Sequence, residues 1–382
     1  MADEGVFRVG ISGSYGGWNL GDEAILQGII GELRRSLPVE ITVFTRDVDD
    51  TRRRHHVDHV VAARTLTRTE VKAEVAPLDL FILGGGGILF DREVAMYLRE
   101  MRLAQELGIP TMVYAVSAGP LHDPSMQQQV FETLRGASVI TVRERRAKKI
   151  LEDVGIRCEI VVTADPAFLL EPEPVPQELL LGDRLLPERP VMGMSVREPG
   201  LAAPKLNEIL YHDLLANAAD FMIDRFDVDV VFVPMEQRKQ DMQESHAVLA
   251  KMLQPQRAWL LRGNYSPGQL LSVMGRFEFV VGMRLHFLIF AALQGVPFVA
   301  LPYASKVGGI LDELGVSMPP MSSVNAGRLL SYIDRYWDAR DEMRAKVQAA
   351  LPSIKERARE NNRIAVRLLR GESVTEACAV GA

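Results

Sequence analysis

The sequence has little cysteine, no surplus of basic residues and no long uncharged apolar run. Its 382 residues include only two cysteines, Cys158 and Cys378, too few for a disulfide framework or a cysteine-ligated zinc site, and this fits a reducing compartment. A formal net charge of −6 argues against a general nucleic-acid-binding protein. The acidic N-terminus lacks the pattern of a signal peptide, and charges interrupt the best candidate for a membrane span. We therefore expect a cytoplasmic protein that is at most peripheral to a membrane.

Short β-branched runs alternate with longer amphipathic segments, a pattern typical of an α/β fold. Most of the short runs are almost continuously apolar, which indicates strands covered by helices on both faces. Segment 171–190 contains five prolines and interrupts the alternation. We predict two Rossmann-like open-sheet domains that face a cleft, with ligands at the carboxyl ends of the strands. The predicted parts are an N-terminal domain over 1–172, a linker over 173–190, a C-terminal domain over 191–345, a helix that packs back over 346–371 and a flexible tail over 372–382.

Two glycine-rich segments follow predicted strands in the first half. The segment SGSYGGWNLGDEA (12–24) leads into a predicted helix, and LGGGGILFD (83–91) follows a buried strand. Glycines allow a backbone to approach a ligand closely, and the amides at a helix start favour anions. The structural alternatives are a capped turn in the first segment and tight packing in the second. The candidate ligand-binding residues are Gly16, Gly17, Asn19, Asp22, Gly85 and Gly86.

Arginines recur at the ends of predicted strands. Arg284 lies in the most apolar segment of the chain, and a buried guanidinium needs an anion from the protein or from a ligand. Arg143 and Arg197 each precede a glutamate that could pair with them. Together such arginines would suit a ligand that carries a phosphate and a carboxylate.

His286 follows Arg284 at a predicted strand-to-helix turn. Its imidazole can gain or lose a proton near neutral pH, so it is a candidate for proton transfer. Lys306 comes after the next predicted strand and would add a cation at the same edge of the sheet. The run RRRHH (52–56), by contrast, reads as a solvated run of charges, and the sequence offers no constellation of metal ligands.

Taken together, these motifs resemble those of polysaccharide pyruvyl transferases, particularly the CsaB type that modifies secondary cell-wall glycans. The resemblance covers roughly 8–345. It rests on GSYGGWNLGDEAIL, LGGGGIL, YAVSAGPL, TVRERRAKKIL followed by TADPAFLL, and GMRLHFLIFAALQGVPFVALPYASKV. It implies a GT-B-like fold and transfer of a pyruvyl group from phosphoenolpyruvate to a sugar of a cell-wall or extracellular polysaccharide precursor, with formation of a cyclic ketal.

The resemblance also implies roles for individual residues. The family's donor-binding triplet matches Arg284, Leu285 and His286, and a second donor-binding arginine corresponds to either Arg143 or Arg197. The C-terminal domain would hold phosphoenolpyruvate, with Lys306 as a further clamp on its anions. The N-terminal domain, with the glycine-rich segments, would hold the acceptor. His286 would act as general acid or as general base, and neither a metal nor a cofactor is implied.

Two other functions stay open at this point. A GT-B glycosyltransferase would hold the diphosphate of a nucleotide-sugar with similar basic groups. A non-catalytic relative would bind a glycan or a partner protein instead. For the transferase, the expected partners are phosphoenolpyruvate and a saccharide acceptor, which the CsaB resemblance implies to be lipid-linked at the inner face of the plasma membrane. The sequence leaves the acceptor sugar, the hydroxyls used and the oligomeric state open.

Overall fold

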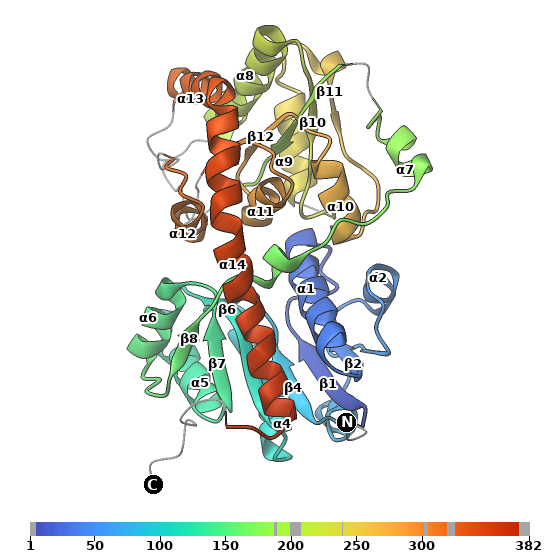
Figure 1. The fold of residues 1–382 in the computed structure, drawn as a ribbon, viewed down its shortest axis with the longest axis vertical. Helices are drawn as coiled ribbons and strands as arrows, with labels where there is room; N and C mark the ends of the chain where they lie inside the picture. Colours follow the sequence, from blue (N-terminus) through green and yellow to red (C-terminus); the bar gives the residue numbers. More distant parts are fainter. Residues whose placement is uncertain are drawn as a thin grey trace. The chain divides into compact units, whose positions relative to one another are not determined.

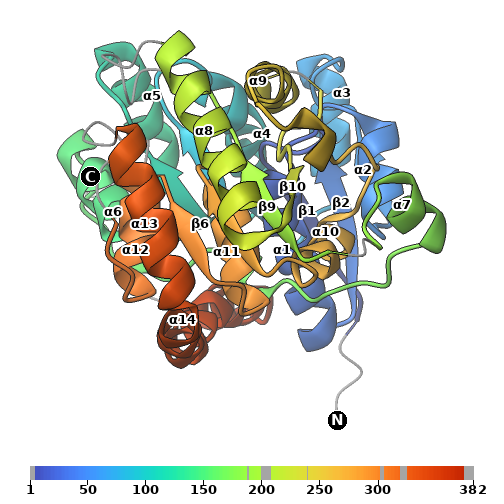
Figure 2. The same ribbon diagram turned by 90° about the horizontal axis from the view of Figure 1, so that it is seen from above.

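The computed structural model describes residues 5–186, 189–198, 208–238, 240–301, 305–318 and 325–373, with only the backbone at 208, 209, 305 and 306. These residues form two α/β units (Figures 1 and 2). The first unit contains the chain up to Gly17, Asp22–Leu170 and the chain from Ile354 onward. The second contains Trp18–Gly21 and Glu171–Ser353. The division falls after Leu170, where the sequence suggested 172, and the short segment Trp18–Gly21 belongs to the second unit.

The first unit is built around a parallel sheet in the order β3-β2-β1-β4-β6-β7-β8, with β5 paired to β6. Its strands are β1 (Phe7–Ser12), β2 (Val39–Phe44), β3 (His59–Val61), β4 (Leu80–Leu83), β5 (Gly86–Leu89), β6 (Thr111–Ala118), β7 (Val139–Val142) and β8 (Ile160–Val162). Its helices are α1 (Leu20–Ser36), α2 (Val48–Arg54), α3 (Arg68–Val75), α4 (Val94–Glu106), α5 (Pro124–Leu134), α6 (Arg145–Val154) and the short η1 (Pro166–Leu169).

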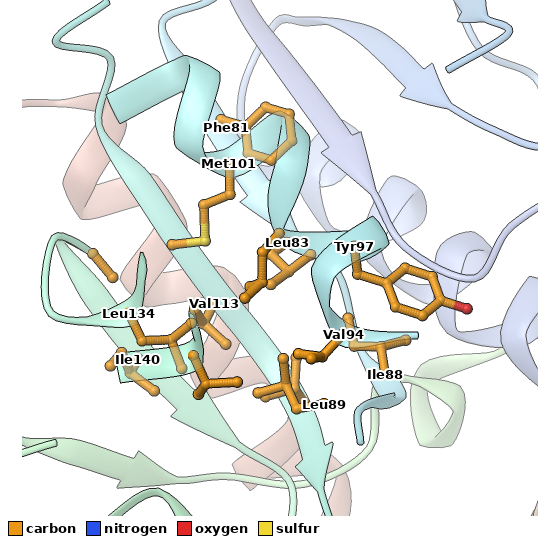
Figure 3. Packing of buried hydrophobic residues seen from close by; sticks show 14 of the residues in the cluster. Phe81, Leu83, Ile88, Leu89, Val94, Tyr97, Met101, Val113, Leu134 and Ile140 are labelled. Carbon is orange, nitrogen blue, oxygen red and sulfur yellow. The ribbon is translucent and has the colours of Figure 1, made fainter. Parts of the chain in front are cut away.

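The core of this unit forms because β4, β6 and β7 are mainly apolar and are buried on both faces. Figure 3 shows Phe81 and Leu83 of β4 packed against Met101 of α4, with Leu134 of α5 close by. On the other face, α14 (Arg340–Leu369) is fixed by Asn361, whose amide oxygen accepts hydrogen bonds from the hydroxyls of Thr141 in β7 and of Thr163 just after β8. Helices thus cover both faces of the sheet.

The second unit has a smaller parallel sheet in the order β11-β10-β9-β12-β13. Its strands are β9 (Val191–Ser195), β10 (Asp229–Phe232), β11 (Ala258–Leu260), β12 (Phe279–Gly282) and β13 (Phe298–Ala300). Its helices are α7 (Gln177–Gly182), α8 (Glu208–Phe226), α9 (Gln240–Leu249), the short η3 (Pro255–Arg257), α10 (Pro267–Met274), α11 (Leu285–Leu293), α12 (Ser305–Glu313), α13 (Ala326–Asp338) and the first part of α14. No helix in the described ranges is both long and apolar enough to span a bilayer.

Both sheets reverse their direction of growth at one place. In the first unit β1 lies between β2 and β4, and in the second unit β9 lies between β10 and β12. Open α/β sheets bind ligands at the carboxyl ends of the two strands that flank such a reversal. The topology therefore draws attention to the loops after β1 and β4 and to those after β9 and β12.

Several short elements escaped sequence analysis. Helices α2 and α3 and strand β3 were not predicted, β5 begins inside the glycine-rich segment, and α7 lies inside the predicted linker.

The prediction that RRRHH (52–56) is a solvated run of charges was wrong in part. Arg54 and His55 are buried because Arg54 pairs with Asp50 and His55 bonds to Glu23. The predicted tail lies outside the described residues from 374 onward.

Candidate functional site

Arg197 and Arg284, the two candidate arginines of the second unit, follow the two strands at its topological reversal. Ser195 of β9 is the register partner of Gly282 of β12, and the Met283 amide donates to the Ser195 carbonyl at 3.1 Å. Arg197 and Arg284 each come two residues after this matched pair. The structure therefore brings Arg197 and Arg284 to the same stretch of the sheet edge.

Arg284 has its anionic partner within the protein. It stands at the start of α11, and its Nε lies 2.8 Å and 3.1 Å from the two carboxylate oxygens of Asp241. Its Nη2 also donates to this carboxylate. Asp241 is fully buried and the Arg284 side chain is 12% exposed. The two-pronged contact with Asp241 accounts for a guanidinium in an apolar segment and fixes the plane of its fork.

Asp241 also organises the loop after β10. Its Oδ2 accepts the backbone amides of Met235 at 3.1 Å and of Glu236 at 3.0 Å. One turn further along α9, Glu244 bonds to His212 at 2.8 Å in a second buried pair. Sequence analysis missed both carboxylates, although their spacing of three residues places them on one face of α9.

Tyr211 links this buried polar cluster to the arginines. Its hydroxyl donates to the carbonyl oxygen of Arg197 and contacts the sulfur of Met283. Burial raises the pKa of Tyr211 well above its ordinary value, although the hydrogen bond to Arg197 and the charge of Arg284 oppose this. The tyrosine is therefore neutral at physiological pH and acts here as a hydrogen-bond donor.

His286 lies in the first turn of α11 and packs against Gly21 of the same unit. A Cβ added to Gly21 would stand 2.1 Å from Nδ1 of His286, so only glycine fits there. The segment is held in the second unit by an antiparallel bridge between Asn19 and Glu236 and by the Leu20 amide, which donates to Met235 at 2.8 Å. The structure thus brings Gly21 to the histidine predicted to move protons.

The other predicted donor residues differ in their surroundings. Leu285 is buried in α11. The backbone of Lys306 lies in α12, just after β13, but its side chain falls outside the described part of the chain. Arg143 belongs to the first unit and is buried against Asp165 at 2.6 Å and Glu144 at 3.1 Å.

The two carboxylates account for the burial of Arg143. Burial lowers the pKa of this guanidinium, but Asp165 and Glu144 outweigh it and leave the pKa raised. A ligand is not needed to explain an arginine in this place. Its assignment to the donor site stays a prediction.

In the first unit, the first glycine-rich segment packs against other residues of the same unit. Gly16 has φ +68°, and a Cβ there would meet the Thr45 hydroxyl at 2.3 Å. Its amide donates to Glu23 at 2.8 Å, and the same carboxylate bonds to His55 at 2.9 Å. Gly17 is more open, with its Cβ position 3.7 Å from Nη1 of Arg46. Sequence analysis missed Glu23, a residue of α1 whose carboxylate accepts the Gly16 amide and so fixes this loop.

The second glycine-rich segment lies beside the first, since Ser12 of β1 pairs with Leu83 of β4. A Cβ on Gly84 would meet the Tyr15 hydroxyl at 2.1 Å, and one on Gly85 would meet Ile25 at 2.8 Å. Gly86 has φ +93° and its Cβ position is 3.3 Å from a carboxylate oxygen of Asp22. Asp22 therefore lies close to Gly86. Gly84 and Gly85 are next to buried side chains of the protein itself, which accounts for the need for glycine at these two positions.

Comparison with known proteins identifies the family of the chain. The family model for polysaccharide pyruvyl transferase matches residues 19–305, a range that begins at Asn19 and includes Arg197, Arg284 and His286. The chain belongs to the polysaccharide pyruvyl transferase family. It is therefore a member of a family of transferases that act on polysaccharides. A search of curated proteins gave no match.

Solved structures with low sequence identity share the fold of this family member. A candidate UDP-N-acetylglucosamine 2-epimerase from Listeria monocytogenes is 12% identical, with TM-score 0.67 over 97% of this chain and 99% of that one. UDP-GlcNAc 2-epimerase from Neisseria meningitidis, bound to UDP-GlcNAc, is 9% identical, with TM-score 0.65 over 96% and 100%. The ADP-heptose lipopolysaccharide heptosyltransferase II of Escherichia coli is 14% identical, with TM-score 0.52 over 88% and 100%. The predicted GT-B-like α/β fold is confirmed.

Proposed function

We propose that this chain transfers the pyruvyl group of phosphoenolpyruvate to a sugar of a cell-wall or extracellular polysaccharide precursor and forms a cyclic ketal. The observation that carries the proposal is the meeting of Arg197 and Arg284 at the reversal of the second sheet, with His286 two residues beyond Arg284. Phosphoenolpyruvate carries a phosphate and a carboxylate, and two guanidiniums at one ligand-binding edge match that pair of anions.

Arg284 is suited to this work because Asp241 fixes its orientation before a ligand arrives. A preoriented fork loses less conformational freedom on binding than a mobile side chain would. Arg197 is the arginine that we pair with it, because both follow neighbouring strands in the same unit. Lys306 and Arg143 remain further candidates for the donor anions.

The reaction needs one proton moved to carbon and two hydroxyl protons removed. Protonation of the methylene carbon of phosphoenolpyruvate produces a cationic centre at its neighbouring carbon, which one sugar hydroxyl attacks as it loses its proton. The C–O bond to phosphate then breaks, and a second hydroxyl attacks the same carbon and loses its proton, which balances the proton on the departing phosphate. The arginines would hold the anions throughout, and His286 would move a proton as general acid or general base.

Incubation with phosphoenolpyruvate and a glycan acceptor should release phosphate and add a pyruvyl ketal. Arg284→Ala should weaken phosphoenolpyruvate binding about ten- to hundredfold, because a charged hydrogen bond contributes about 1.5–3 kcal/mol. Arg284→Lys should recover only part of this, since an ammonium lacks the planar fork. His286→Ala should instead lower turnover by about 10² to 10⁴-fold, with a smaller effect on binding.

Matched Arg197→Met and Arg143→Met variants identify the second donor arginine, because only the correct one should lose affinity for phosphoenolpyruvate. If calorimetry detects no binding of phosphoenolpyruvate to the well-folded native protein, the proposal fails. Stabilisation by UDP- or GDP-sugars alone in a thermal-shift screen would replace it with a nucleotide-sugar glycosyltransferase.

The finer assignment is to the CsaB type. It would place the reaction in the cytoplasm, at the inner face of the plasma membrane, on a lipid-linked saccharide. Activity on a lipid-linked acceptor with none on the free glycan would support this step, and the reverse preference would contradict it.

A further inference from the structure

Trp18 has an unusual backbone for a bulky aromatic residue. Its φ is +61°, in the left-handed region that glycine and asparagine favour and that is a genuine outlier for large side chains. Glycine adopts positive φ without steric strain, as nearby Gly16 does. A glycine at position 18 would therefore be less strained than the tryptophan that is present. Residues held in such conformations concentrate at functional sites, where the rest of the structure maintains them.

The strained backbone is fixed by hydrogen bonds within the second unit. The Gln237 amide donates to the Trp18 carbonyl at 3.1 Å, and the next residue, Asn19, forms a bridge with Glu236. The guanidinium of the exposed Arg238 stacks over the indole at 3.9 Å from the ring centroid. The indole itself is partly exposed and lies outside the buried core. The protein therefore maintains a fixed and partly exposed aromatic ring at the cost of local strain.

Its position relates this ring to the predicted proton-transfer residue. Gly21, which packs against the His286 ring, comes only three residues after Trp18. Three residues span at most roughly 11 Å even when fully extended. The backbone of Trp18 is therefore within the reach of a small saccharide from the part of the chain that touches His286.

We infer that Trp18 is a binding platform for a sugar ring of the acceptor. This inference rests on the proposed function. The C–H face of a pyranose packs on a flat aromatic surface, and an indole supplies a large contact area with little loss of side-chain freedom. Arg238 holds the plane of the indole, and the loop that bonds to Asp241 holds its backbone. A sugar on this platform would present hydroxyls toward His286, where the ketal would form.

Substitution at Trp18 separates sugar binding from stability. Trp18→Gly removes the aromatic ring and also relieves the positive-φ strain, so Tm should stay the same or rise. The apparent KM for the acceptor should rise at least tenfold, while the affinity for phosphoenolpyruvate measured by calorimetry stays within twofold. Trp18→Phe, which keeps an aromatic ring, should recover part of the acceptor affinity. The probes are a panel of p-nitrophenyl glycosides, with binding measured by saturation-transfer NMR and turnover by phosphate release.

Trp337→Phe is the matched control. Trp337 stacks on Phe226 at 4.5 Å between centroids, so its replacement should lower Tm and leave the acceptor KM unchanged. The inference is overturned if Trp18→Gly keeps the native acceptor KM, if its affinity for phosphoenolpyruvate falls in parallel, or if no glycoside binds the native protein with phosphoenolpyruvate present. A native protein that fails to bind phosphoenolpyruvate at all would instead overturn the proposed function.

Discussion

The pair of Arg284 and Asp241 makes a prediction about stability that is separate from catalysis. Arg284→Met would leave the Asp241 carboxylate buried without its cation, and breaking a buried ion pair from one side costs about 3–5 kcal/mol. Asp241 keeps two backbone amide donors, from Met235 and Glu236, so we expect the lower end of this range. For a unit of this size, about 3 kcal/mol corresponds to a fall in Tm of roughly 6–12 °C.

A double-mutant cycle tests the origin of this loss. Asp241→Asn alone should also destabilise the protein, because it leaves a largely buried guanidinium without its carboxylate. The combined Arg284→Met, Asp241→Asn variant removes both charges and should be more stable than the sum of the two single losses predicts. Arg197→Met is the matched control, since Arg197 is only partly buried and its loss should change Tm much less.

Urea denaturation of the four proteins gives the coupling energy. Additive losses, within about 0.5 kcal/mol, would refute the ion-pair reasoning. The cycle also changes how a lowered Tm is interpreted. From sequence alone, equal and modest losses in the Arg284 and His286 variants together with a lowered Tm would have indicated a structural pair in the core. The contact with Asp241 predicts a loss of Tm in Arg284 variants even if Arg284 binds the donor, so binding of phosphoenolpyruvate must be measured well below the lowest Tm.

Three further predictions concern the first unit. Tyr15→Phe removes a buried hydroxyl that has no hydrogen-bond partner among the described residues. It should raise the free energy of unfolding by about 1 kcal/mol, and a loss in urea denaturation would contradict this. Asn361→Ala removes hydrogen bonds that tie α14 to the sheet and should lower that free energy by about 2–4 kcal/mol, whereas a change below about 1 kcal/mol would show that these bonds contribute little. Burial raises the pKa of Tyr97 to about 12, and it also raises the pKa values of Tyr15 and Tyr114. Unfolded tyrosines lose protons near pH 10, so above that pH the folded protein holds more protons and its stability should fall by up to about 1.4 kcal/mol per pH unit for each tyrosine. A flat stability profile between pH 10 and 11.5 would contradict this.

Much of the fold could be predicted because most strands are mainly apolar. The missed elements are those whose burial depends on partners elsewhere in the chain. Helix α2 is one example: VDDTRRR reads as exposed, yet Arg54 is buried because Asp50, one turn earlier, neutralises it. Strand β3 is another, since three residues between charged segments carry too little pattern to be recognised.

The candidate site could be predicted only where one residue conflicts with its own surroundings in the sequence. Arg284 stood out because it is charged in an apolar segment. Its partner Asp241 lies 43 residues earlier and conflicts with nothing nearby, so no local signal identified it. Likewise, the pairing of Asn19 with Glu236 joins two segments that lie far apart in the sequence, so no local pattern indicates it.

The glycine-rich segments show why a local signal can have two explanations. Their glycines were expected either to make room for a ligand or to allow tight packing, and the large group next to Gly84 is the side chain of Tyr15. Tyr15 is fully buried and neutral at physiological pH, because burial raises its pKa well above the ordinary value. At the corresponding reversal of the second sheet the neighbouring strands lead instead to Arg197 and Arg284. A neutral phenol cannot offset the charge of a phosphate and a carboxylate, whereas two guanidiniums can. The two sheets share their topology, but charge makes the second one the better candidate for the donor anions.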